Sequence, residues 1–181
     1  MLPTVNQTVR RRILASPEIA ALLAWPFDLR FEWHDAPCPW FRFEPEIPFV
    51  VVAADGGGGL FVEVESGGVW FVSSEGAAGP IAECLEELVG LVVALPYFRD
   101  LVAFAGRGLE AMALRADVLE AELRADNPGL EDARRCVLLG LSLPVLAEPV
   151  AILLRRLTRS RAELSVLAPD GWPCEPLVRL A

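Results

Sequence analysis

Residues 49–95 decide the fold, and they read FVVVAADGGGGLFVEVESGGVWFVSSEGAAGPIAECLEELVGLVVAL. Runs of β-branched and aromatic residues alternate there with glycine-rich turns, a pattern typical of antiparallel strands joined by hairpins. Glycine supplies the positive φ angles that tight hairpin turns need. The expected strands are 49–52, 60–65 and 69–72, and the expected turns are 55–59 and 66–68.

Side-chain alternation predicts which faces of these strands are buried. In residues 60–65 the even positions are all aliphatic, whereas the odd positions are Phe61, Glu63 and Glu65. Successive side chains of a strand point to opposite faces, so this strand is expected to be covered on one side. The run Val69–Val72 has no polar residue and predicts a central strand that is buried on both faces.

An amphipathic helix is expected to begin at Pro80 and to continue to Leu95. Apolar residues recur at helical spacing along it, and three glutamates lie on the opposite face. The apolar stripe consists of Ile81, Cys84, Leu85, Leu88, Val92 and Leu95, and the glutamates are Glu83, Glu86 and Glu87. A helix with this stripe is expected to pack across the sheet.

The chain is therefore expected to have an α+β fold, with an antiparallel sheet of about four to six strands packed against helices. Its C-terminal half is expected to be helical. At 181 residues, the chain suits a single domain that spans residues 1–181. Residues 25–79 form the sheet-rich part and residues 80–160 the helical part, with a possible seam at the glycines of 106–108.

Capping residues predict the ends of several helices outside this core. Ser16 and Pro17 fit the N-cap and the first helical position, and so do Asn127 and Pro128 of a later helix, which Gly140 is expected to end. One or two helices are expected within 4–24, and a short helix is expected at 97–105. A longer helix is expected to begin at Leu109, with the Leu109 side chain facing inward. The last helix is expected to begin at Ser142 or Glu148. The tail is expected to form a final hairpin or an edge strand.

Two further strands are expected at 29–33 and 41–44, where apolar and charged residues alternate. If the two strands pair with each other, Arg30 and Glu32 lie across from Glu44 and Arg42. Opposite charges at such positions stabilise a strand pair by about 0.2–1 kcal/mol each.

Composition excludes several classes of function. The net charge is −9 with no lysine in the chain, which argues against nucleic-acid binding, because that affinity comes largely from cations on phosphates. An acidic surface instead favours either a protein that stays monomeric and soluble or one that binds a basic protein partner. No apolar run approaches the ~20 residues of a membrane-spanning helix, and no apolar stretch follows the N-terminal arginines 10–12, so a cytoplasmic protein is expected.

No residue set in the sequence predicts a catalytic, cofactor or metal site. The glycine run 56–59 precedes a strand rather than a helix and has no lysine beside it, which favours a hairpin over a phosphate loop. His34, Asp35 and Cys38 carry metal-binding atoms, but a zinc site needs three or four ligands and no second pair has the right spacing. Ser73, Ser74 and Glu75 lack any base other than His34. The chain is expected to be non-enzymatic.

Cysteine and tryptophan are interpreted as packing residues in most positions. The cysteines are expected to be free and mostly buried, with Cys84 and Cys136 on apolar helix stripes. The tryptophans are expected mainly in the core, except that Trp40 and Trp172, beside prolines, are expected to be partly exposed. An exposed tryptophan can anchor an interface.

The order of these pieces resembles the SMI1/KNR4 (SUKH) superfamily. The resemblance rests on the turn at 55–59, the aromatic strand Val69–Val72, the pair Ser74-Glu75 and the helix around 81–88. It implies a bacterial immunity protein, which binds and neutralises a cognate toxin, often a nuclease, of a polymorphic toxin system. A scaffold or regulatory module is the alternative that the same resemblance implies, and a small-molecule enzyme that uses the His34 loop is a third interpretation.

Carboxylates beside the glycine turn are the expected partner-binding surface, because an inhibitor of a basic nuclease can present carboxylates where phosphates would bind. The candidate residues are Asp55, Glu63, Glu65, Trp70, Glu75, Glu83, Glu86 and Glu87. The spacing of the three glutamates favours a solvated helix face over a binding surface, and an acid–base pair would require burial that separates their pKa values. Reversing Glu63 and Glu65 to arginine is expected to slow toxin binding if they lie on that surface.

Overall fold

A computed structural model describes residues 7–31, 39–65, 68–159 and 164–178 of the chain. The helices are α1 (Gln7–Leu14), α2 (Pro17–Ala24), α3 (Leu85–Ala94), α4 (Phe98–Val102), α5 (Leu109–Asp126), α6 (Leu130–Leu141) and α7 (Pro149–Leu157), with a 3-10 turn at Ala105–Arg107. The strands are β1 (Arg42–Glu44), β2 (Phe49–Ala54), β3 (Leu60–Val64), β4 (Val69–Val72), β5 (Ala77–Ala82), β6 (Ser165–Leu167) and β7 (Glu175–Pro176). The expected α+β class and the helical C-terminal half are confirmed.

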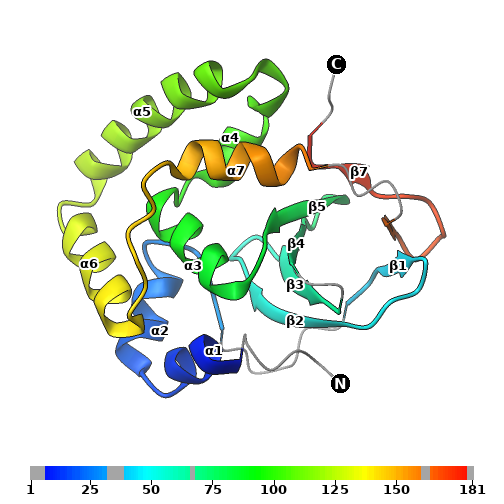
Figure 1. The fold of residues 1–181 in the computed structure, drawn as a ribbon, viewed down its shortest axis with the longest axis horizontal. Helices are drawn as coiled ribbons and strands as arrows, with labels where there is room; N and C mark the ends of the chain where they lie inside the picture. The colour runs from blue at the N-terminus through cyan, green and yellow to red at the C-terminus, as the bar shows by residue number, and fades with distance from the viewer. Residues whose placement is uncertain (1–6, 32–38, 66–67, 160–163, 179–181) are drawn as a thin grey trace.

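The main sheet has five strands in the order β2-β3-β4-β5-β7. Strands β2 to β5 form an antiparallel meander, and β7 adds to β5 in parallel. A second sheet pairs β1 with β6. In Figure 1 the helices gather on one side of the main sheet and β1 lies on the other side. The sheet is therefore sandwiched between a helical layer and a small two-stranded layer.

Alternation along β4 divides the interior into two cores. Val69 and Phe71 pack into the core shared with the helices, whereas Trp70 and Val72 pack into the core shared with Phe43 of β1. The expectation that Val69–Val72 is buried on both faces is confirmed. The expectation of one covered face for residues 60–65 is wrong, because all of Leu60–Val64 is buried, Glu63 included.

The segment expected to open the helix at Pro80 is a strand instead. Ala77–Ala82 forms β5, and the helix begins only at Leu85, with Cys84 as its N-cap. The reason is that β4 lies inside the sheet and needs a partner for the backbone groups on its second edge. Ile81 of β5 and Leu88 of α3 are both fully buried. The apolar residues expected along one helix are therefore buried by a strand followed by a helix.

The pairing considered between 29–33 and 41–44 is not found among the described residues of the two segments. Arg30 forms an isolated bridge with Ala54 at the outer edge of β2, whereas β1 pairs with β6, so that Arg42 lies opposite Leu167 and Glu44 opposite Ser165. Glu32 and Trp33 lie outside the described residues. Among the described residues, β1 therefore has β6 as its partner, and it covers the second core.

The helical half follows the predicted periodicity with shifted ends. Ser16 caps α2 as expected, by accepting a hydrogen bond from the Ile19 N–H, and Pro149 takes the first position of α7. α6 begins at Leu130 after Gly129 rather than at Pro128, and it ends at Leu141 with Ser142 in the left-handed conformation rather than at Gly140. Three side chains expected to be inward are exposed: Leu109, Trp25 and Cys136.

The C-terminal tail combines both of the expected arrangements. A bridge between Leu167 and Pro173 closes a turn after β6, and β7 then becomes the edge strand beside β5. Trp172 lies in that turn and is exposed, as expected, and Trp40 is half-buried. In the described part of the chain, no helix is both long and apolar enough to cross a membrane.

Candidate functional site

Asp55 organises the glycine turn between β2 and β3. Its Oδ1 accepts hydrogen bonds from the Gly57 N–H at 2.9 Å and the Gly59 N–H at 2.7 Å, and the Asp55 N–H donates to the Gly59 carbonyl at 2.9 Å. Aspartate side chains commonly bond their own turn backbone in this way. The N–H groups of Gly57 and Gly59 are thus used within the turn rather than left for a phosphate, and the interpretation of 55–59 as a hairpin is confirmed.

Arg99 of α4 joins this turn to the segment that follows α2. Its Nη1 lies 2.6 Å from Asp55 Oδ2, and its Nη2 lies 2.7 Å from Asp28 Oδ2. Asp28 also accepts the Gly56 N–H at 2.8 Å. Partial burial acts to lower the pKa of the Arg99 guanidinium, but the hydrogen bond to Asp28 and the charges of Asp55 and Asp28 outweigh it, so this pKa lies above its ordinary value.

A groove of about 560 Å³ lies beside the Arg99 cluster. Trp25 and Pro26 line it at the end of α2, Pro96 and Tyr97 line it at the start of α4, and the C-terminal part of α5 lines it farther along. Four carboxylates and two guanidiniums are among its lining residues; these are Asp28, Asp100, Glu122 and Asp126, and Arg30 and Arg99. The groove is therefore acidic.

Three of the four carboxylates are available to a partner. Asp100, Glu122 and Asp126 are exposed, and none of them makes an ion pair with another described residue, whereas Asp28 is held by Arg99. Trp25 is 72% exposed at the same groove. An indole face beside unpaired carboxylates suits a cationic side chain, through ion pairing and cation–π attraction. We call Trp25, Asp100, Glu122 and Asp126 the acidic groove set.

The structure separates the acidic residues that were expected to form one surface. Glu75 is exposed in the β4–β5 turn, at the same end of the sheet as Asp55, since Leu60 pairs with Val72 there. Glu65 is exposed at the opposite end, beyond β3. Glu63 is only 7% exposed, so its reversal to arginine tests the stability of the sheet rather than binding. Trp70 is also buried and belongs to the second core.

Two of the three glutamates near α3 are engaged by arginines of the last helix and its end. Arg156 contacts Glu83 at 2.5 Å and makes two bonds to Glu87, at 2.8 and 2.9 Å. Burial acts to raise the pKa of Glu87, but the hydrogen bond from Arg156 and its charge outweigh it and hold the pKa below its ordinary value. Glu86 is half-buried. This side of α3 therefore holds α7 in place instead of facing a partner.

No metal-binding group of three or more side chains occurs among the residues that the structure describes, and the cysteines among them are free. His34, Asp35 and Cys38 lie outside the described residues. Comparison of the chain with protein-family models, with curated proteins and with solved structures finds no match.

Gly59 sits where the turn meets the core, and we expect Gly59→Ala to destabilise the protein by about 1–3 kcal/mol. A Cβ there would lie 2.6 Å from the Phe71 ring and 2.8 Å from Asp55 Oδ2. The Phe71 ring is packed against Phe61 at a centroid distance of 4.9 Å and cannot move aside freely. Urea-induced unfolding measures the change.

The control is Gly57→Ala in the same turn, where a Cβ would meet Asp55 Oδ1 at 3.4 Å, an ordinary contact. We expect the control to stay within about 0.5–1 kcal/mol of the wild type. Equal losses in the two variants would show that close packing at Gly59 is not the cause.

Proposed function

We propose that this chain is a non-enzymatic immunity protein that binds and neutralises a cognate toxin, of the nuclease type, from a bacterial polymorphic toxin system. The observation that carries the proposal is the acidic groove beside the Asp55 turn, with the exposed Trp25 on its wall. A toxin-neutralising protein of this kind acts in the cytoplasm of the cell that produces it, and we place the chain there.

Charge supports a basic partner. The chain carries 25 acidic residues against 16 arginines. The lining of the groove likewise has more carboxylates than guanidiniums. A nuclease site is basic because it binds phosphates, so carboxylates that replace the phosphates can occlude it. Opposite fields also accelerate the encounter of two proteins, which matters for a protein that must bind its toxin before damage occurs.

The resemblance to the SUKH superfamily supports the same function. Among the residues that carry it, Asp55 is the one that both organises the hairpin and pairs with Arg99 at the groove. Glu75 lies at the same end of the sheet, and its exposed carboxylate extends the acidic surface beyond the groove. We therefore propose that the partner covers this end of the sheet together with the groove.

The proposal predicts that a toxin gene lies beside the gene for this chain, and co-expression of that toxin domain with the chain tests it. We expect the toxin domain alone to stop growth of a bacterial host and this chain to restore it, with the two proteins copurifying as a complex. Growth arrest that persists at equal expression, with no complex on size-exclusion chromatography, would reject the immunity function.

A further inference from the structure

The long helix α5 carries apolar residues on two opposite faces. The residues of the inner face are buried, and they are Met112, Ala116 and Leu119. A second set lies two positions later in the sequence, about 200° around the helix. In this set Leu114 is 63% and Val118 46% exposed, and Ala121 and Ala125 are exposed as well. We call Leu114, Val118, Ala121 and Ala125 the outer stripe of α5.

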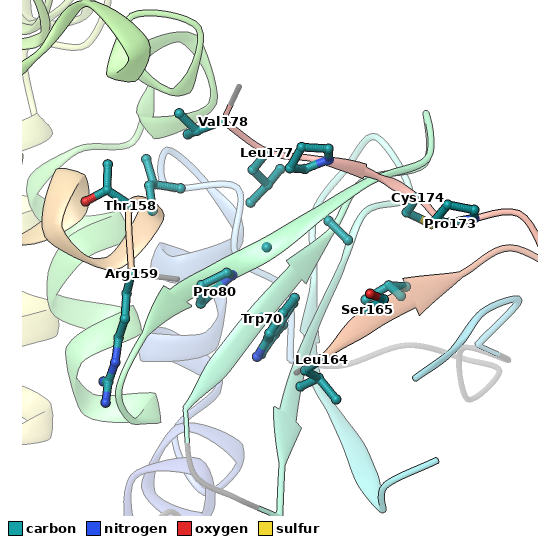
Figure 2. A pocket seen from close by; sticks show the side chains of 15 residues that line it. Trp70, Pro80, Thr158, Arg159, Leu164, Ser165, Pro173, Cys174, Leu177 and Val178 are labelled. Atoms are coloured by element: carbon teal, nitrogen blue, oxygen red, sulfur yellow. The ribbon is translucent and has the colours of Figure 1, made fainter. Parts of the chain in front are cut away.

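The body of the protein covers the inner face of α5 and leaves the outer stripe exposed. α5 contacts α7, α4 and the 3-10 turn, and Figure 1 shows it along the outer edge of the molecule with α7 on its inner side. A cavity of about 370 Å³ between β5, the end of α7 and the tail shares no lining residue with the outer stripe (Figure 2). The outer stripe is therefore a separate surface.

The spacing of the outer stripe suits a second helix. Its members lie four, three and four positions apart, which is the spacing of the a and d positions of a coiled coil. Leu114 and Val118 supply apolar area, and the small side chains of Ala121 and Ala125 let another helix approach closely. The occupant that matches such a seam is an amphipathic helix with its own apolar face.

Unpaired carboxylates lie on both flanks of the outer stripe. Asp117 is on one flank, and Glu122 and Asp126 are on the other. All three are exposed and make no ion pair with another described residue. Because Glu122 and Asp126 also belong to the acidic groove set, the outer stripe and the acidic groove form one continuous surface.

The arginines in this part of α5 do not cancel these charges. Arg124 lies 2.6 Å from Glu120 and 3.0 Å from Glu131, so its charge is already balanced. Arg115 is half-buried, with its guanidinium 5.9 Å from the centroid of the Phe104 ring. One arginine therefore stands against three unpaired carboxylates. A second copy of the chain would bring these carboxylates against each other, whereas a basic partner would pair with them.

We propose that the outer stripe of α5 binds a basic amphipathic helix of a protein partner. The apolar face of that helix lies on Leu114 and Val118, and its cationic side chains pair with the carboxylates on the two flanks. This inference rests on the proposed function, because it names the element of a basic toxin that lies beside the acidic groove. Its test uses a peptide in place of a toxin, so the two proposals can fail separately.

The probe is a synthetic amphipathic peptide with leucine at every a and d position and lysine at every e and g position. Its twin carries glutamate in place of lysine. Isothermal titration measures affinity, and the backbone amide signals of a ¹⁵N-labelled sample locate the peptide. We expect the lysine peptide to bind saturably and to shift the signals of Leu114 to Asp126, and the glutamate peptide not to bind. Absent binding of the lysine peptide, equal binding of its twin, or shifts confined to another surface overturns the proposal.

A pair of double variants tests the role of the outer stripe. Leu114→Gln with Val118→Gln is expected to weaken binding of the lysine peptide by about tenfold, because apolar area is lost from the contact. Both side chains are exposed, so the fold is expected to persist. The matched control is Leu139→Gln with Val145→Gln, the same two residue types at 72% and 80% exposure outside the stripe. Equal affinities of the two double variants overturn the proposal.

Self-association is the competing result. A dimer of the wild type on size-exclusion chromatography that only the α5 variant abolishes would place a second copy on the outer stripe and overturn the proposal. A toxin complex that forms although the lysine peptide does not bind would remove the helix site and leave the immunity function standing. Peptide binding at α5 by a chain that does not restore growth would do the reverse.

Discussion

Replacing Arg134 with methionine is expected to lower the free energy of unfolding by about 2–4 kcal/mol. The guanidinium lies on α6, is only 13% exposed, and binds both oxygens of Glu120 on α5, at 2.6 and 2.9 Å. It also donates to the Val93 and Ala94 carbonyls, at 3.0 and 3.1 Å. One side chain thus joins α5, α6 and the C-terminal end of α3, where a cation also offsets the helix dipole.

The same cluster predicts a pH dependence. The Arg134 hydrogen bonds, against an opposing effect of burial, lower the pKa of Glu120 from 4.5 to about 2. A carboxyl with a depressed folded-state pKa stabilises the protein fully above its unfolded pKa and loses this contribution as the pH falls through the folded value. The stability difference between wild type and Arg134→Met is therefore expected to shrink as the pH falls from 4.5 toward 2.

The control for this prediction is Arg135→Met, one position along the same helix. Arg135 is 66% exposed and pairs with the exposed Asp132, so its loss is expected to cost less than about 1 kcal/mol. Urea unfolding of the three proteins at neutral and at acidic pH measures both effects. Equal stabilities of the Arg134 and Arg135 variants, or a difference that does not change with pH, would contradict the role given to the cluster.

The parts of the fold that are set by local chemistry could be predicted from the sequence. The Asp55 turn needs only neighbouring glycines and a side chain that accepts hydrogen bonds from the turn's own backbone. The wholly apolar composition of Val69–Val72 predicts burial on both faces. β5 could not be predicted in this way, because its residues contain Gly79 and Pro80 and its strand conformation comes from pairing with β4. Tertiary context overrides weak local preference there.

Strand pairings between segments far apart in the sequence could not be predicted from local sequence patterns. β1 pairs with β6, which lies more than a hundred residues later, although the 29–33 segment is closer in sequence and carries complementary charges. β6 places the uncharged Leu167 and Ser165 opposite Arg42 and Glu44, so the charge pattern gave no indication of this partner. The pairing follows instead from the second core, where Phe43 and Val166 cover Trp70 and Val72.

The candidate site was predicted in part. Asp55 was foreseen, but Arg99 lies 44 residues from it and 71 residues from Asp28, and no local pattern joins the three. Glu83 and Glu87 have the spacing of an exposed helix face, yet Arg156 reaches them from 69 residues or more along the chain. Periodicity predicts the direction of a side chain but not the partner that arrives from another element.

Under the proposed function, reversing the charge of the acidic groove is expected to slow association with a toxin domain by about 10- to 100-fold at low salt. The variant carries Asp100→Lys, Glu122→Lys and Asp126→Lys, three exposed positions that make no ion pair with other described residues. The fold is therefore expected to persist, because no internal contact of these side chains is lost. The effect should appear in the association rate more than in the dissociation rate.

The matched control is Glu44→Lys, Glu46→Lys and Glu110→Lys, which changes the net charge equally at exposed positions that do not line the groove. If only the total charge attracted the toxin domain, both variants would slow association alike, and the groove would have no special role. Local steering instead predicts a clearly larger effect in the groove variant, and a weaker dependence of its association rate on salt. Stopped-flow measurement of the two variants across ionic strengths separates the two cases, because screening reduces the contribution of exposed charges and leaves that of buried contacts.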